Sequence, residues 1–204
     1  MAQDNQEQEA KFMISDRAAL QAKLLALRAE LKHARVFESN LRFDLPDGSL
    51  SARRLVLRLR QDERARLTLK GPAEIGAEVT TRSEIEFEVS SFDNARALLE
   101  ALGYRLSVMY EKYRTTYALG GCEVTLDEMP YGDFAEIEGP GAEAIRGVAN
   151  LLGLAWETRT AESYLMLFSR LRAAGLSAQN LSFAEVTQNF PPEAFGLKAS
   201  DAAA

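Results

Sequence analysis

Pairs of carboxylates spaced at i and i+2 occur near both ends of the patterned part of this sequence. Glu7 and Glu9 form one pair, and Glu136 and Glu138 form the other. On an extended strand, each pair places two carboxylates on one face, about 7 Å apart. If the pairs met without a counter-charge, some of these carboxylates would be protonated. A hard divalent cation removes this conflict, and Mg²⁺ or Mn²⁺ would complete its shell with water and phosphate oxygens.

Basic side chains follow the same alternating spacing and oppose apolar residues. Leu57-Arg58-Leu59-Arg60 is the clearest run. Seven such bases need an anionic partner: Lys11, Arg58, Arg60, Lys70, Arg82, Lys112 and Arg114. A triphosphate, with about four negative charges, suits them, because Arg grips phosphate through two parallel hydrogen bonds. We therefore predict that the acids bind metal, the metal bridges to phosphate, and the bases bind phosphate.

These side chains need a scaffold, and most of the chain alternates with the period of a β-strand. Eight strands are predicted at 6–14, 36–45, 54–60, 65–70, 80–89, 109–119, 122–127 and 134–138. Helical spacing predicts four helices at 16–32, 92–102, 142–152 and 161–172. This balance indicates an α+β fold with a largely antiparallel sheet.

The charged faces of these strands are unusually uniform. One interpretation is that each strand is half buried, with its charged face in bulk water. However, nearly every strand repeats paired Glu or paired bases, which favours a sheet closed with its charged faces inward. About sixteen ionisable or polar side chains, Asn40 and Arg42 included, would then line one lumen.

Bulk composition limits the remaining functions. The chain has 204 residues, of which 47% are hydrophobic, and this favours one domain over residues 1–175 with an extension at 176–204. We expect the tail to be disordered from about Lys198. The net charge of −6 argues against nucleic-acid and membrane partners, and a homodimer is left open. Cys122 is the only cysteine, and no secretory leader or 18-residue apolar run is visible, so a cytoplasmic setting is expected.

Other residues invite chemical roles but favour structural ones. His33, the only histidine, is expected to cap the predicted first helix. Trp156, Tyr164 and Phe168 have near-helical spacing and are expected in the core. Tyr110 is likewise expected to be structural.

Seven ordered motifs resemble the CYTH superfamily, also called triphosphate tunnel metalloenzymes. Glu7-Gln8-Glu9-Ala10-Lys11 matches its opening ExExK signature, and the resemblance continues in order to about residue 172. The further matches are FDLPDG at 43–48, LRLR at 57–60, LTLKGP at 67–72, RSEIE at 82–86, EKYR at 111–114 with Asp127, and GDFAEIE at 132–138.

The resemblance implies a closed eight-stranded antiparallel β-barrel, a tunnel open at both ends, with helices packed on the outside. Metal would be held by Glu7, Glu9, Asp127, Glu136 and Glu138. The triphosphate would be held by the seven bases named above, and the catalytic centre would include Lys11, Glu84 and Glu86.

Two departures from the family pattern stand out. Position 40 is Asn and position 42 is Arg, where many members carry Asp and Tyr. The segment 162–167 lacks the Lys that many triphosphatases place over the tunnel mouth. Its Ser163-Tyr164 looks more like the SYxxLL ending of class IV adenylyl cyclases.

Three functions are compatible with these residues. In the first, the 3′ hydroxyl of ATP attacks the α-phosphorus, giving cyclic AMP and pyrophosphate. In the second, water attacks a terminal phosphorus of ATP, inorganic triphosphate or thiamine triphosphate. In the third, the protein binds polyphosphate or a nucleotide without catalysis. The resemblance places the cyclase first.

Overall fold

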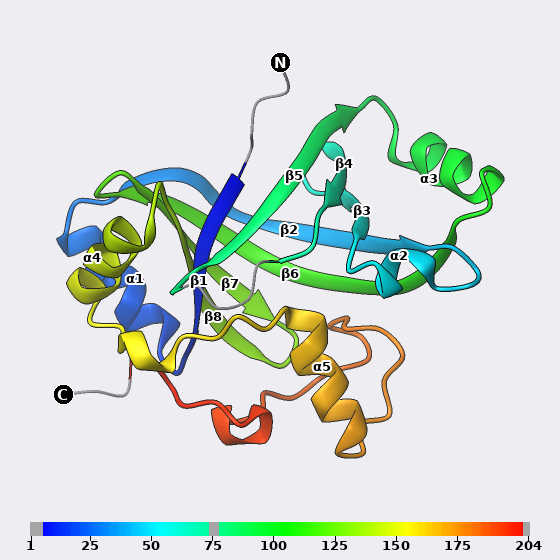
Figure 1. The fold of residues 1–204 in the computed structure, drawn as a ribbon. Coiled ribbons are helices and arrows are strands. Elements are labelled where there is room, and N and C mark those ends of the chain that lie inside the picture. Colours follow the sequence, from blue (N-terminus) through cyan, green and yellow to red (C-terminus); the bar gives the residue numbers. More distant parts are fainter. Residues whose placement is uncertain (1–5, 74–77, 202–204) are drawn as a thin grey trace.

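The described part of the chain forms a ring of antiparallel strands with helices around it (Figure 1). The computed structural model describes residues 6–73 and 78–201, and side chains from residue 8 on. Neighbours around the ring are β1-β5-β4-β3-β2-β6-β7-β8, and β8 pairs with β1. The strands are β1 (Gln6–Ile14), β2 (Glu30–Asp44), β3 (Val56–Gln61), β4 (Ala65–Lys70), β5 (Thr80–Val89), β6 (Arg105–Leu119), β7 (Cys122–Met129) and β8 (Gly132–Glu138).

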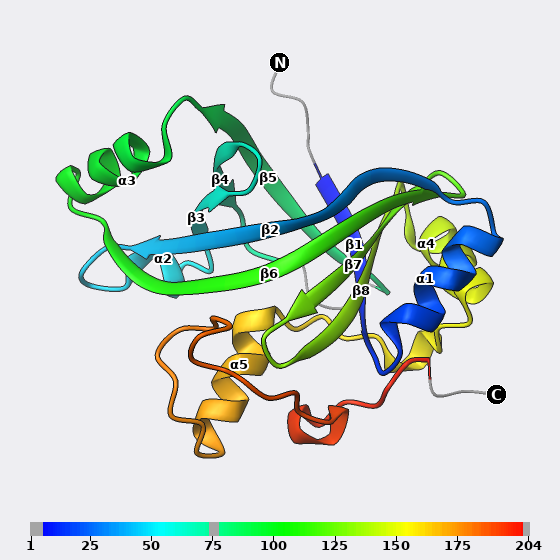
Figure 2. The same ribbon diagram turned by 180° about the vertical axis from the view of Figure 1, so that it is seen from behind.

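The helices cover parts of the outside of the ring and one of its ends. They are α1 (Arg17–Ala26), α2 (Ser49–Ala52), α3 (Phe92–Ala101), α4 (Ala142–Leu152) and α5 (Tyr164–Ala173). In Figures 1 and 2, α1 and α4 lie together beside β1, β7 and β8, α3 lies at the opposite side, and α5 lies below the ring. The α+β class predicted from the sequence is confirmed.

Alternation along the strands separates an apolar outer face from a charged inner face. Phe12, Val124 and Ile137 point outward and pack with Leu24 of α1 and Ile145 of α4, all of them fully buried. This apolar contact fixes the register, because a slip of one residue would turn the charged residues into the core. As a result, Glu9 lies opposite Glu138, and Lys11 lies opposite Glu136.

A second core lies at the end of the ring that faces α5. It contains Met13, Phe134 and Tyr164, together with Leu167 and Phe168 of α5. Tyr131 donates a hydrogen bond of 2.9 Å from its hydroxyl to the carbonyl of Tyr164 and so holds the start of α5 against β8. The tunnel implied by the resemblance therefore has an apolar plug at this end.

The first helix is shorter than its leucine spacing predicts. It ends after Ala26, where Arg28 adopts a left-handed conformation with φ 58°. The amide of Ala29 then bonds back to the carbonyl of Leu24 and closes the helix. The chain enters β2 at Glu30 because pairing with the equally long β6 outweighs helical periodicity. His33 therefore lies on β2, and its predicted role as a helix cap is wrong.

The C-terminal segment, residues 176–201, runs back across the plugged end (Figure 2). Leu181 pairs with Tyr110, Phe190 donates its amide to Tyr131, and Ser200 donates its amide to Met13. Ser200 is fully buried, so the prediction of disorder from Lys198 is wrong as far as residue 201. Among the described residues, no helix is both long and apolar enough to cross a membrane.

Candidate functional site

The inward faces of the strands line a cavity of about 660 Å³, which is within the usual size of small-molecule sites. Ten Lys or Arg and nine Asp or Glu side chains from the described residues border it. The prediction that the charged faces converge on one lumen is confirmed. Acids and bases are almost balanced there, although the whole chain carries a net charge of −6.

Asp127 anchors two of the predicted phosphate-binding bases. Its side chain is fully buried and accepts hydrogen bonds from Lys112 Nζ at 2.9 Å and from Arg114 Nε at 2.6 Å. The hydroxyl of Tyr164 donates a further bond of 2.8 Å. Asp127 is not among the residues that border the cavity. Its geometry fits the positioning of bases, and its role as a metal ligand stays a prediction.

Lys11 and Glu136 form the central ion pair of the cavity, with Lys11 Nζ 3.0 Å from Glu136 Oε1. Arg114 is a second partner of Glu136. Burial lowers the pKa of Lys11, but Glu136, Glu9 and Asp127 outweigh it and raise that pKa above its ordinary value. Lys11 is therefore a cation at neutral pH and suits charge stabilisation, not proton abstraction.

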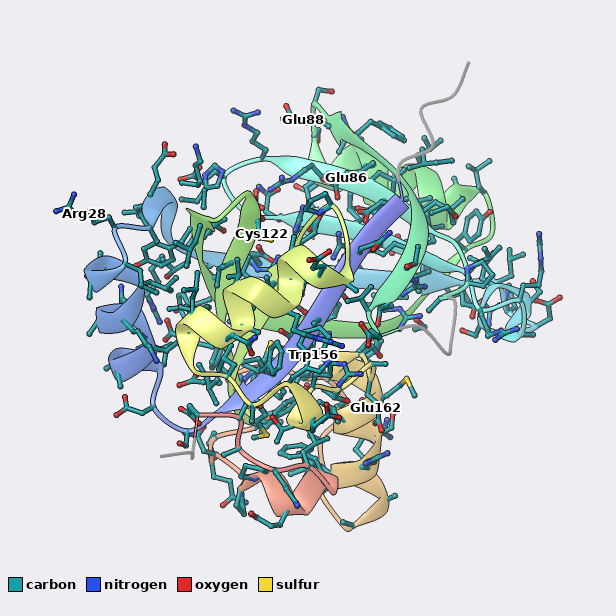
Figure 3. All side chains as sticks on the ribbon, turned by 60° about the vertical axis from the view of Figure 1, so that its left-hand side comes forward. Arg28, Glu86, Glu88, Cys122, Trp156 and Glu162 are labelled. Carbon is teal, nitrogen blue, oxygen red and sulfur yellow. The ribbon has the colours of Figure 1, made fainter. Side chains whose placement is uncertain are left out.

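Glu84 and Glu86, predicted to be catalytic, are counter-ions of the β3–β4 bases. Glu86 accepts a hydrogen bond of 2.7 Å from Thr68 and lies 3.3 Å from Arg60 and 3.4 Å from Arg58. Burial raises the pKa of Glu86, but Arg60, Thr68 and Arg58 lower it overall. Figure 3 shows Glu86 near the end of the ring away from α5.

Lys70 of β4 and Arg82 of β5 also contact protein oxygens. Lys70 Nζ lies 2.8 Å from Glu84. Arg82 donates from Nε and Nη2 to the carbonyl of Gly71, at 2.9 and 2.7 Å. A phosphate that binds these bases must therefore compete with protein oxygens.

Only some of the predicted metal ligands border the same cavity. Glu9, Glu136 and Glu138 border the same cavity, whereas the side chain of Glu7 lies outside the described residues. Within that described part, no three His, Cys, Asp or Glu side chains come close enough to hold a metal. Nevertheless, a set of carboxylate oxygens is the donor type that Mg²⁺ and Mn²⁺ prefer, so the residues fit such an ion in kind.

Sequence reasoning missed Glu38, which is 2% exposed and borders the cavity. It lies 3.6 Å from Lys112 and 3.8 Å from Arg60. Burial raises the pKa of Glu38, but Lys112, Arg114 and Arg60 outweigh it and hold the pKa at about 2. The sequence contained a signal for Glu38, because it lies on the same face of the predicted strand as Asn40 and Arg42.

Replacement of Glu38 by Gln should weaken the pH dependence of stability. Because the folded pKa of about 2 is below the ordinary 4.5, Glu38 stabilises the protein above about pH 4.5, and this is lost as pH falls toward 2. The variant should be less stable by about 3 kcal/mol at pH 7, with a smaller difference at pH 3. Denaturant unfolding at both pH values measures this, and an equal difference at both would contradict it.

Tyr110 and Tyr164 were expected to be structural, yet both also border the cavity. The ring of Tyr164 lies 4.5 Å from Lys11 Nζ and 5.6 Å from Lys112 Nζ. The hydroxyl of Tyr110 accepts a bond of 3.4 Å from Arg58. The signal for Tyr164 was its place in the Ser163-Tyr164 motif, whereas Tyr110 shares the inner parity of Lys112 on β6.

Comparison with known proteins agrees with this geometry. A family model described as the CYTH domain matches residues 5–148. Adenylate cyclase CyaB of Aeromonas hydrophila is 33% identical over 135 residues, which are 64% of this chain and 67% of that protein. A structure from Vibrio parahaemolyticus, provisionally named an adenylate cyclase, has a TM-score of 0.72 at 23% identity, over 82% of this chain and 99% of its own.

Another similar structure is a Hippeastrum protein first assigned as an adenylyl cyclase and described as having a dominant triphosphatase activity. It has a TM-score of 0.60 at 20% identity, over 80% of this chain and 95% of its own. At that identity the likeness concerns the fold. The extent of the family match, together with the curated relative, shows that this chain belongs to the CYTH domain family.

Proposed function

We propose that this protein is a divalent-metal-dependent enzyme that acts on a triphosphate compound inside the ring, which serves as a closed barrel with one plugged end. The observation that carries the proposal is the cavity of about 660 Å³ that ten bases and nine acids of the described residues border. A site for an uncharged ligand would gain nothing from so many buried charges, each of which costs free energy to remove from water. An anionic triphosphate and a divalent metal cation that bind together would contact the bases and the acids, respectively.

The cavity residues would divide the chemistry between them. Arg58, Arg60, Lys70, Arg82, Lys112 and Arg114 would bind and orient the phosphates, and protonated Lys11 would offset charge on a phosphoryl oxygen. Mg²⁺ or Mn²⁺, held by Glu9, Glu136 and Glu138, would supply Lewis-acid activation. Asp127 and Tyr164 would keep Lys112 and Arg114 in place.

Conversion of ATP to cyclic AMP and pyrophosphate is the preferred reaction. It is supported by the Aeromonas hydrophila relative, which is named an adenylate cyclase, and by the Ser163-Tyr164 ending. Triphosphate hydrolysis is the alternative, because the Hippeastrum neighbour is described as a triphosphatase. The buried free thiol of Cys122 supports a reducing, cytoplasmic setting.

A product assay separates these reactions. The purified protein is incubated with Mg²⁺ or Mn²⁺ and, separately, ATP, inorganic triphosphate or thiamine triphosphate, and products are resolved by chromatography. We expect cyclic AMP and pyrophosphate from ATP, and no turnover with EDTA. Orthophosphate from the triphosphates would favour the hydrolase, and binding without turnover would favour a non-catalytic module.

A further inference from the structure

Arg42 is the exceptional cation of the cavity. It lies on the inner face of β2 and borders the cavity, with Arg58 of β3 as its register partner. Most other cavity bases have a carboxylate within 4.0 Å, such as Glu136 for Lys11 and Glu86 for Arg58. The guanidinium of Arg42 has neither an ion pair nor a hydrogen bond within the described residues.

The local sequence explains why Arg42 has no acidic partner. Asn40, two residues earlier on the same face, is a neutral side chain that is fully buried. Asp44, two residues later, is committed to α2: it accepts hydrogen bonds from the amides of Leu50 and Ser51, at 2.9 and 3.1 Å. Glu38, four residues before Arg42 on this face, is paired with Lys112 and Arg60. The inner face of β2 thus gives Arg42 no ion-pair partner.

The surroundings of Arg42 make this arrangement costly in free energy. Burial is the main effect that lowers the pKa of Arg42; Tyr110 and Asp44 raise it, but burial together with Arg82 and Arg58 outweighs them. A partly buried cation among like charges destabilises the fold unless an anion neutralises it. An anionic ligand in the cavity would relieve that cost, and Arg42 has no protein oxygen to surrender first.

We propose that Arg42 binds a phosphoryl group of the substrate, as an anion contact additional to the seven bases of the family pattern. This inference rests on the proposed function, since it requires a triphosphate in the cavity. A free guanidinium can form charge-assisted hydrogen bonds to phosphate oxygens, which are stronger than neutral ones. Arg42 therefore favours triphosphate over shorter, less charged phosphates.

The test measures binding of inorganic triphosphate by calorimetry in EDTA, for the wild type, Arg42→Gln and Arg42→Lys. We expect Arg42→Gln to weaken binding about tenfold or more, and Arg42→Lys to recover part of it. The loss should be smaller for pyrophosphate. Without ligand, the melting temperature of Arg42→Gln should equal or exceed that of the wild type, because an unpaired cation has been removed.

Arg96→Gln is the control. Arg96 lies on α3, away from the cavity, and is half-exposed and paired with Glu100, so its loss should change triphosphate affinity less than about twofold. Equal affinity of Arg42→Gln and the wild type would overturn the inference and leave the proposed function standing. Failure of the wild type to bind triphosphate both in EDTA and with Mg²⁺ would overturn both.

Discussion

Replacement of Glu136 by Gln should lower turnover of the triphosphate substrate by at least about 10²-fold. Glu136 is the proposed metal ligand most deeply embedded in the network, with ion pairs to Lys11 and Arg114. Burial raises its pKa, but Lys11, Arg114 and Lys112 bring that pKa well below its ordinary value, so Glu136 is ionised at neutral pH. Gln keeps the shape but removes the charge that a divalent cation needs. Steady-state assays at saturating Mg²⁺ or Mn²⁺ measure the loss.

Two controls make the Glu136 result specific. Glu88→Gln alters an exposed carboxylate on β5 that does not border the cavity, and it should keep full turnover. Glu136→Gln should also bind inorganic triphosphate in EDTA at least as tightly as the wild type, because Lys11 and Arg114 lose a competing oxygen. Normal turnover in Glu136→Gln would remove the metal assignment.

Asp127→Asn should have the largest effect on stability, a loss of about 3 to 5 kcal/mol in the free energy of unfolding. The fully buried carboxylate neutralises Lys112 and Arg114, and an amide cannot. For a chain of this size, the melting temperature should fall by about 6 to 20 °C. Differential scanning calorimetry without ligand measures the change.

Glu123→Gln is the control, because Glu123 lies on the same strand, β7, and its side chain is exposed. It should cost at most about 1 kcal/mol. If Asp127→Asn melted like the wild type and lost only metal binding, Asp127 would be a metal ligand instead of an anchor for the bases.

The scaffold was predictable because its signals are local. The bounds of β1, β4, β5 and α4 agree with those expected from alternation, helical spacing and turn residues. The inward direction of the charges was also predictable. A half-buried strand explains one charged face, but not the repetition of Glu pairs and basic pairs on nearly every strand. The start of β2 was not predictable, because Leu27 and Leu31 fit helical spacing and only pairing with β6 selects the strand.

The sequence did not predict which acid pairs with which base inside the cavity. The pattern assigned acids to metal and bases to phosphate, whereas the structure pairs them with each other, as in Arg60 of β3 with Glu86 of β5. β3 and β5 are not neighbours in the ring, so this pairing depends on side-chain directions across the lumen and not on register alone. The contact of Tyr164 with Asp127 depends on the docking of α5, which no strand motif specifies.

The hydrogen bonds made by α5 and the C-terminal segment show that the folded unit extends beyond the part of the chain that matches the family. The family match ends at residue 148, yet Tyr164 completes the shell of Asp127, and Ser200 is tied to β1 through Met13. A fragment cut at the limit of sequence similarity would leave Phe134 and Tyr131 facing water and deprive Asp127 of a donor. The part of the chain after residue 148, which lies outside the family match, thus forms the base of the cavity.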